Sequence, residues 1–123
     1  MSAPFTIEID RRRRLVRLTL VGFWEMSFVG QFVNAVDEAV PRLGCQPGEH
    51  DVLVDLSQFA IQTQQVFSAC QSFVFHAPNP PRRLALVSGT GLARMQFKRV
   101  IDPARNQRIF DSVAEADAWL ASG

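Results

Sequence analysis

Near its N-terminus, the chain alternates hydrophobic and polar side chains in the pattern of two β-strands. Over residues 5–10, phenylalanine and isoleucine alternate with threonine, glutamate and aspartate, and residues 15–21 repeat the alternation with leucine and valine. A two-residue period places the apolar side chains on one covered face of a sheet. Only the arginine run at residues 11–14 separates the two segments, so we expect an antiparallel hairpin with this run at its exposed tip.

The next segment repeats its apolar residues every three or four positions, which predicts an amphipathic helix. Ser27 occupies the position of an N-cap, and Val29, Phe32 and Val36 follow on one helix face. Pro41 disfavours helical geometry in the residue before it, so we expect the helix to end there.

The rest of the chain alternates strands with amphipathic helices. The apolar run at residues 52–56 suits a central strand that is covered on both faces. The further elements expected are strands over residues 84–88 and 108–110, and helices that begin near Thr63, after Gly91 and at Ser112. The order β-β-α-β-α-β-α-β-α predicts an α/β fold with a single domain over residues 1–123. Its sheet is expected to be five-stranded and mostly parallel, with an antiparallel edge strand from the N-terminal hairpin and four helices on both faces.

Composition narrows the function classes. The chain has 123 residues, 47% of them hydrophobic, and 13 basic against 12 acidic residues give a formal net charge of +1. A core of this size needs neither metal nor disulfide, so Cys45 and Cys70 are expected to be ordinary thiols. The near-zero charge, and the lack of aromatic residues among the arginines at 11–14, argue against a nucleic-acid partner. No apolar run reaches the length of a membrane span or a signal peptide, so we expect a cytoplasmic protein without stable membrane anchoring.

Several short motifs resemble the STAS domain family, named for sulfate transporters and anti-sigma-factor antagonists. They are the strand at 52–57 that leads toward a helix near Thr63, the Gly-Phe-Trp segment at 22–24 and the closing Ala-Trp-Leu at 118–120. Together they are similar to the SpoIIAA-like branch of small bacterial proteins. The resemblance covers nearly the whole chain and implies a STAS/SpoIIAA-like domain over residues 1–123. It also implies kinship with the CRAL-TRIO lipid-binding fold and a role in binding a protein partner.

The resemblance also implies a phosphorylation site, which this sequence alters. Antagonists of the family carry an Asp-Ser-Ser-Gly type segment where the third strand leads into the second helix, and a partner kinase phosphorylates a serine there. The equivalent residues 60–65 contain neither serine nor glycine. Thr63 is the candidate phosphoacceptor, because a helix N-terminus stabilises an added phosphate. Its simpler role is that of an N-cap, which needs no partner.

The turn after the fourth strand is a candidate anion- or nucleotide-binding site. Ser88, Gly89, Thr90 and Gly91 follow a strand and open a helix, and Arg94 lies one turn inside that helix. Free N–H groups at a helix N-terminus, together with a nearby arginine, can hold an anion. The alternative is that the two glycines only permit a tight turn.

Asp55 is the candidate for acid–base chemistry. We expect it at the carboxyl edge of a central strand, where ligands of open α/β sheets bind. An aspartate in that position also commonly bonds to loop N–H groups. His50 and His76 show no metal-ligand spacing with carboxylates, and no nucleophile motif of the Gly-x-Ser-x-Gly type occurs, so neither a metal site nor a cofactor is expected.

Aromatic residues provide the candidates for an interface. The chain contains ten phenylalanines, of which Phe67 and Phe75 do not fall on the apolar stripe of the second helix. Trp24 lies in a predicted loop. Exposed aromatic residues would mark a homodimer interface or an apolar ligand pocket. The equally simple alternative is that these side chains add to the core.

Three function classes remain open. The leading one is a non-enzymatic STAS-like regulatory or protein-interaction module that lacks the usual phosphorylatable Ser-Gly motif and binds a protein partner or a second copy. The second is a binding protein for an apolar or lipid-like small molecule held between helix and sheet. The third is an anion or nucleotide binder, or an enzyme, built on Asp55 and the turn at residues 88–91. The sequence offers that third class no complete set of nucleophile, base and orienting group.

Overall fold

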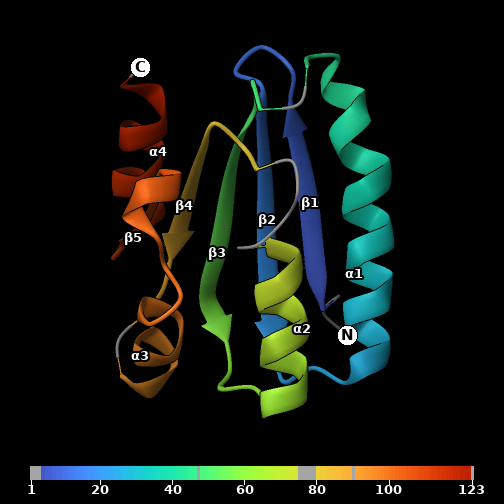
Figure 1. The fold of residues 1–123 in the computed structure, drawn as a ribbon, viewed down its shortest axis with the longest axis vertical. Coiled ribbons are helices and arrows are strands. Elements are labelled where there is room, and N and C mark those ends of the chain that lie inside the picture. The colour runs from blue at the N-terminus through green and yellow to red at the C-terminus, as the bar shows by residue number, and fades with distance from the viewer. Residues whose placement is uncertain (1–3, 47, 75–79, 90, 123) are drawn as a thin grey trace.

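Five strands form one sheet whose order follows the chain (Figure 1). The computed structural model describes residues 4–46, 48–74, 80–89 and 91–122. β1 pairs with β2 in antiparallel register, and each later pair of neighbours is parallel. The strands are β1 (Phe5–Asp10), β2 (Leu15–Gly22), β3 (Asp51–Phe59), β4 (Arg83–Val87) and β5 (Gln107–Phe110). The helices are α1 (Met26–Ala39), α2 (Gln64–Val74), α3 (Leu92–Lys98) and α4 (Val113–Ala121), with short 3-10 turns η1 (Val40–Leu43) and η2 (Pro103–Arg105).

Helices cover both faces of the sheet, and the strand register decides which side chains meet them. On the face of α1 and α2, Leu18 and Val54 lie in the larger core, and α3 adds Phe97 to it. On the opposite face, Leu53 and Ala85 pack in a smaller core with α4. Neighbouring residues along a strand point to opposite faces, so one apolar run supplies both cores. The predicted α/β fold, its order of elements and its antiparallel edge strand are confirmed.

Aromatic rings fill the larger core. The ring of Trp24 lies 5.1 Å from that of Phe59 and 5.4 Å from that of Phe32, measured between centroids. Phe32 in turn meets Phe5 at 5.4 Å and Phe73 at 5.9 Å, both in edge-to-face geometry. Such pairs add to the free energy of burial, since the edge of one ring is attracted to the face of the other.

The first helix begins earlier than its sequence indicates. Glu25 is the N-cap and makes no side-chain capping bond, whereas Ser27 lies inside the first turn. The prediction of Ser27 as N-cap is therefore wrong. The physical reason is the burial of Trp24, which holds the chain in place immediately before the helix. Pro41 falls in η1 directly after the helix, which confirms the predicted end.

The third strand is longer than its apolar run, which moves Asp55 away from the strand end. β3 continues to Phe59, whose side chain is buried, so the prediction that Asp55 lies at the carboxyl edge is wrong. The register with β2 shifts between Thr19 and Val21. At this irregularity the N–H of Ser57 donates to Asp55 Oδ1 at 3.0 Å, so Asp55 stabilises the strand's own backbone.

The arginine run forms the tip of the β1–β2 hairpin, as predicted. Part of its charge is paired within the chain. Arg13 Nη1 lies 2.6 Å from Asp117 Oδ1 on α4, and Arg17 Nη2 lies 3.5 Å from the same oxygen. These ion pairs attach the hairpin to α4 on the face of the sheet that α4 covers.

An ion pair between the buried carboxylate of Asp51 and the partly exposed Arg82 anchors the start of β3. Arg82 donates from Nε and Nη2 to the two carboxylate oxygens of Asp51, at 2.9 and 2.7 Å. His50 is buried beside this pair, and its carbonyl oxygen accepts a hydrogen bond from the N–H of Arg82 at 2.7 Å. Burial lowers the pKa of His50 below its usual value of 6.5, and the Asp51 carboxylate opposes that shift.

Protonation of His50 predicts a pH dependence of stability. Because the folded state holds the pKa below 6.5, the unfolded chain binds the proton more readily. The contribution of neutral His50 to the free energy of unfolding is therefore fully present above pH 6.5 and is lost as the pH falls below it. Urea unfolding at several pH values from neutral down to the acid side should show a falling free energy of unfolding. The variant His50→Gln should flatten this slope, and an unchanged slope would contradict the assignment.

The aromatic core predicts a contrast between two phenylalanines. Phe32→Ala should lower the free energy of unfolding by about 3 to 5 kcal/mol, because it leaves a cavity among rings that cannot close it. Phe23→Ala, at a side chain that is 60% exposed, should change it by no more than about 0.5 kcal/mol. Chemical denaturation measures both values, and similar losses for the two variants would refute this core arrangement.

Candidate functional site

Large apolar side chains are exposed at one end of the molecule. Within the described residues, four are markedly exposed: Phe23 at 60%, Met95 at 54%, Ile61 at 47% and Met26 at 40%. All four belong to segments that follow the carboxyl ends of parallel strands β2, β3 and β4. Figure 1 shows the β2–α1 and β3–α2 connections side by side at this end. We call the exposed Phe23 and Ile61 of these connections, together with Met26 at the start of α1, the apolar rim.

The side chain of Gln62 joins the two connections that carry the apolar rim. Its Oε1 accepts from the N–H of Trp24 at 2.9 Å, and its Nε2 donates to the carbonyl oxygens of Gly22 at 3.0 Å and Ala60 at 2.8 Å. A direct backbone bond from Ala60 N–H to the carbonyl of Gly22, at 3.1 Å, runs beside them. Gln62 is buried, so these bonds are shielded from competing water. The two connections are thereby held as one unit.

Trp24 fixes the inner side of this unit. Its side chain is only 1% exposed, and its indole N–H donates to the carbonyls of Val21 at 3.1 Å and Pro4 at 3.3 Å. The prediction that Trp24 is an exposed interface residue is therefore wrong. Phe67 is also buried, with its ring 5.4 Å from that of Phe97, so the same prediction is wrong for Phe67. Phe75 lies outside the described residues.

Thr63 lies beside the apolar rim at the start of α2. Its Oγ1 accepts from the N–H of Val66 at 3.2 Å, which is the N-capping bond, while the residue as a whole is exposed. The hydroxyl therefore already has a structural role, and the prediction that Thr63 accepts phosphate stays a prediction.

At the predicted anion-binding turn, the described polar side chains, those of Ser88 and Arg94, are buried or already paired. Ser88 is 1% exposed, and its hydroxyl oxygen has no hydrogen-bond partner within the described structure. Arg94 Nη1 lies 2.6 Å from Asp111 Oδ1 and also donates to the carbonyl of Ser88 at 3.2 Å. Its charge thus ties the ends of β4 and β5 together. Anion or nucleotide binding at this turn stays a prediction.

The two glycines of this turn differ, because only Gly91 has a backbone conformation that favours glycine. Gly91 precedes α3 with φ of +85°, a conformation that favours glycine. A Cβ atom on Gly89 would meet the carbonyl oxygen of Ser57 at 3.8 Å, which is ordinary contact. Thr90 lies outside the described residues.

Both cysteines, Cys45 and Cys70, are free thiols. Burial raises the pKa of the Cys70 thiol to about 11, so it is a poor nucleophile at neutral pH. Over the part of the chain that is described, no group of three or more His, Cys, Asp or Glu residues is placed to hold a metal ion. No described helix has the length and apolar character needed to span a bilayer.

The sequence patterns do not identify the apolar rim and Gln62 as a site, although some of these residues carry a sequence signal of exposure. Ile61 is a large apolar residue among polar ones between a strand and a helix, so its exposure follows from its position. Phe23 and Trp24 are adjacent aromatic residues, and nothing local indicates which of them is buried. Gln62 carries no sequence signal, because its role depends on a contact with residues about forty positions earlier.

Comparison with family models and with curated proteins yields no match to this chain. Among solved structures, the chain is similar to an uncharacterized protein of the DUF3478 family from Shewanella loihica PV-4, described as having a SpoIIAA-like fold. The likeness covers 98% of this chain and 99% of that one, with a TM-score of 0.71 and 18% sequence identity. The SpoIIAA-like fold that the motif resemblance implies is therefore confirmed. At this identity the likeness shows the fold alone.

The hydrogen bonds of Gln62 predict a measurable loss of stability when its carboxamide is removed. In the variant Gln62→Ala, the N–H of Trp24 and the carbonyl oxygens of Gly22 and Ala60 lose their hydrogen-bond partner in a buried site. The free energy of unfolding should fall by about 1 to 3 kcal/mol, measured by urea denaturation. Gln65→Ala is the matched control, since Gln65 is exposed on α2 and should cost no more than about 0.5 kcal/mol. Equal effects of the two variants would contradict the role of Gln62.

Proposed function

We propose that this chain is a non-enzymatic protein-interaction module that binds a partner protein through the apolar rim. The observation that carries the proposal is the concentration of exposed Phe23, Met26 and Ile61 at two connections that Gln62 holds together. Scattered exposed apolar residues are ordinary on protein surfaces, but several large ones grouped at one end of a molecule commonly mark an interaction site.

The rim is preorganised for binding, which supports a recognition role. Exposed loops usually lose conformational entropy when they bind, and this loss weakens affinity. Here the connections are already fixed by three side-chain hydrogen bonds from Gln62 and by the buried ring of Trp24. Phe23 and Ile61 can therefore contact a partner without first ordering their backbone.

The size of the rim favours a different protein over a second copy of this chain. A stable dimer commonly buries about 800 Å² on each partner, contributed by about 20 to 30 residues. The apolar rim offers three large side chains, with Met95 of α3 as a fourth near the same end. An area of this extent suits a transient interaction, so we expect the isolated protein to be monomeric.

The charges around the rim indicate the partner's chemistry. Glu25 lies between Phe23 and Met26, is exposed, and has no cationic partner among the residues that the structure describes. The neighbouring Gln64 and Gln65 at the start of α2 are uncharged. A complementary partner would present apolar side chains with a lysine or arginine beside them, because unlike charges at the edge of an interface favour association.

In-cell photo-crosslinking in the native host tests this proposal. A benzoylphenylalanine introduced at Phe23 should give one discrete crosslinked species in cells. Ile61→Glu should reduce its yield about tenfold or more, since it places a charge in the apolar contact. Asn34→Glu adds the same charge at an exposed position two turns along α1 and should leave the yield within about twofold.

Two results would contradict the proposal. A crosslinked species with the mass of two copies, together with a dimer in light scattering of the purified protein, would replace the partner by self-association. A crosslinked species that is unaffected by Ile61→Glu, or no crosslinked species at all, would remove the rim as a binding surface.

A further inference from the structure

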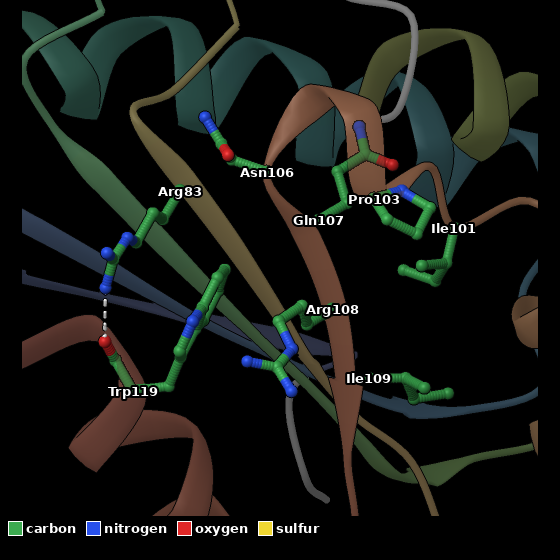
Figure 2. A pocket seen from close by; sticks show the side chains of 8 residues that line it. All are labelled: Arg83, Ile101, Pro103, Asn106, Gln107, Arg108, Ile109 and Trp119. Carbon is green, nitrogen blue, oxygen red and sulfur yellow. Dashed lines mark hydrogen bonds between the residues drawn. The ribbon is translucent and has the colours of Figure 1, made fainter. Parts of the chain in front are cut away.

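A second surface feature lies away from the apolar rim, along the free edge of β5. It is a hollow of about 460 Å³ whose residues come from β4, η2 and the residues beside it, β5 and α4. Figure 2 shows the side chains that form it: Arg83, Ile101, Pro103, Asn106, Gln107, Arg108, Ile109 and Trp119. Pockets for small molecules are commonly about 300 to 1,000 Å³, so the volume suits a small ligand.

Two arginines stack on the indole of Trp119 in this hollow. The guanidinium carbon of Arg83 lies 5.0 Å from the ring centroid, and that of Arg108 lies 5.5 Å from it. In Figure 2 they lie on either side of the indole. Arg108 is also 5.6 Å from the ring of Phe110, which itself packs 5.5 Å from Trp119. Stacking of this kind fixes the plane of a guanidinium group and leaves its N–H edge available for hydrogen bonds.

Neither arginine has a carboxylate partner among the described residues. Arg83 Nη1 donates to the carbonyl of Trp119 at 2.6 Å and to Ser122 Oγ at 3.0 Å, both neutral acceptors. Arg108 is exposed, its guanidinium group lies over the two aromatic rings, and its side chain has no hydrogen bond or ion pair to the described residues. The two guanidinium groups therefore place positive charge that no described carboxylate pairs on both sides of one indole ring.

Three arginines elsewhere in the chain show what an ion pair does in this fold. Arg13, Arg82 and Arg94 each lie within 2.7 Å of a carboxylate oxygen, on Asp117, Asp51 and Asp111 respectively. In those three cases the charge connects elements of the fold. At the β5 edge the corresponding charge faces a cavity, which is the arrangement expected for an oxyanion ligand.

The opposite side of the hollow is apolar. Ile101, Pro103 and Ile109 lie on the other side of β5 from the two arginines in Figure 2. Ile101 and Ile109 pack against the larger core, which fixes this wall. A ligand that contacts both sides must carry a negative group for the arginines and a short apolar part for the isoleucines.

We propose that the hollow at the β5 edge binds a small amphipathic anion, a molecule with a phosphate or carboxylate group on a short apolar chain. Arg108 binds the oxyanion through the N–H edge that stacking on Trp119 leaves free, and Arg83 adds positive charge from the other side of the indole. Ile101, Pro103 and Ile109 contact the apolar part. This site is separate from the apolar rim and uses other elements, so either proposal can fail without the other.

NMR of the indole N–H of Trp119 tests the proposal directly. The chain has two tryptophans, so its spectrum contains two indole signals, and Trp119→Phe identifies the relevant one. Titration with hexyl phosphate or with hexanoate should shift the Trp119 signal saturably. Arg108→Met removes the charge but keeps a long side chain on the ring, and it should weaken binding about tenfold or more. Arg42→Met, at an exposed arginine of η1, is the matched control and should change binding by no more than about twofold.

The probes also separate the parts of the proposal. Tighter binding of hexyl phosphate than of hexanoate identifies a phosphate ligand, and the reverse identifies a carboxylate. Hexanol that shifts the signal equally well would overturn the role of the arginines, and inorganic phosphate that binds equally tightly would overturn that of the apolar wall. The absence of a saturable shift with either anion, or an equal loss in Arg42→Met, would overturn the site as a whole.

Discussion

The buried carboxamide of Gln62 is the constraint on which the end of the molecule with the apolar rim depends. It accepts from the N–H of Trp24 and donates to the carbonyl of Gly22, across a separation of about forty residues in sequence. Buried backbone groups of loops need partners, and a side-chain amide supplies a donor and an acceptor at once. The result is a unit with two sides, one that buries Trp24 and one that exposes Phe23 and Ile61.

The fold was largely predictable from the sequence, because periodic apolar residues report directly on which faces are covered. The order of strands and helices, and the antiparallel first pair, follow from that periodicity. The missed boundaries have a common cause, which is burial by distant parts of the chain. Trp24 is fixed by contacts outside its loop, so α1 starts before Ser27. The buried ring of Phe59 extends β3 beyond Asp55.

The candidate site was less predictable, because the exposure of a side chain and its ion pairing depend on the folded structure as a whole. Phe23 and Trp24 are chemically alike neighbours, yet one is 60% exposed and the other 1%. The arginines behave similarly: Arg82 forms an ion pair with the buried carboxylate of Asp51, whereas the next residue, Arg83, stacks on Trp119 without a carboxylate partner in the described structure. The two arginines are equivalent in the composition. Only the folded structure determines whether an arginine forms an ion pair between elements or lines a cavity.

Native-state hydrogen exchange at the amide of Trp24 tests most directly whether Gln62 makes the two connections one unit. If it does, this amide exchanges only when the whole protein unfolds. Its protection free energy should then equal the global free energy of unfolding within about 1 kcal/mol and fall with denaturant at the same slope. Exchange through a local opening, with a protection free energy far below the global value and little dependence on denaturant, would contradict a preorganised apolar rim.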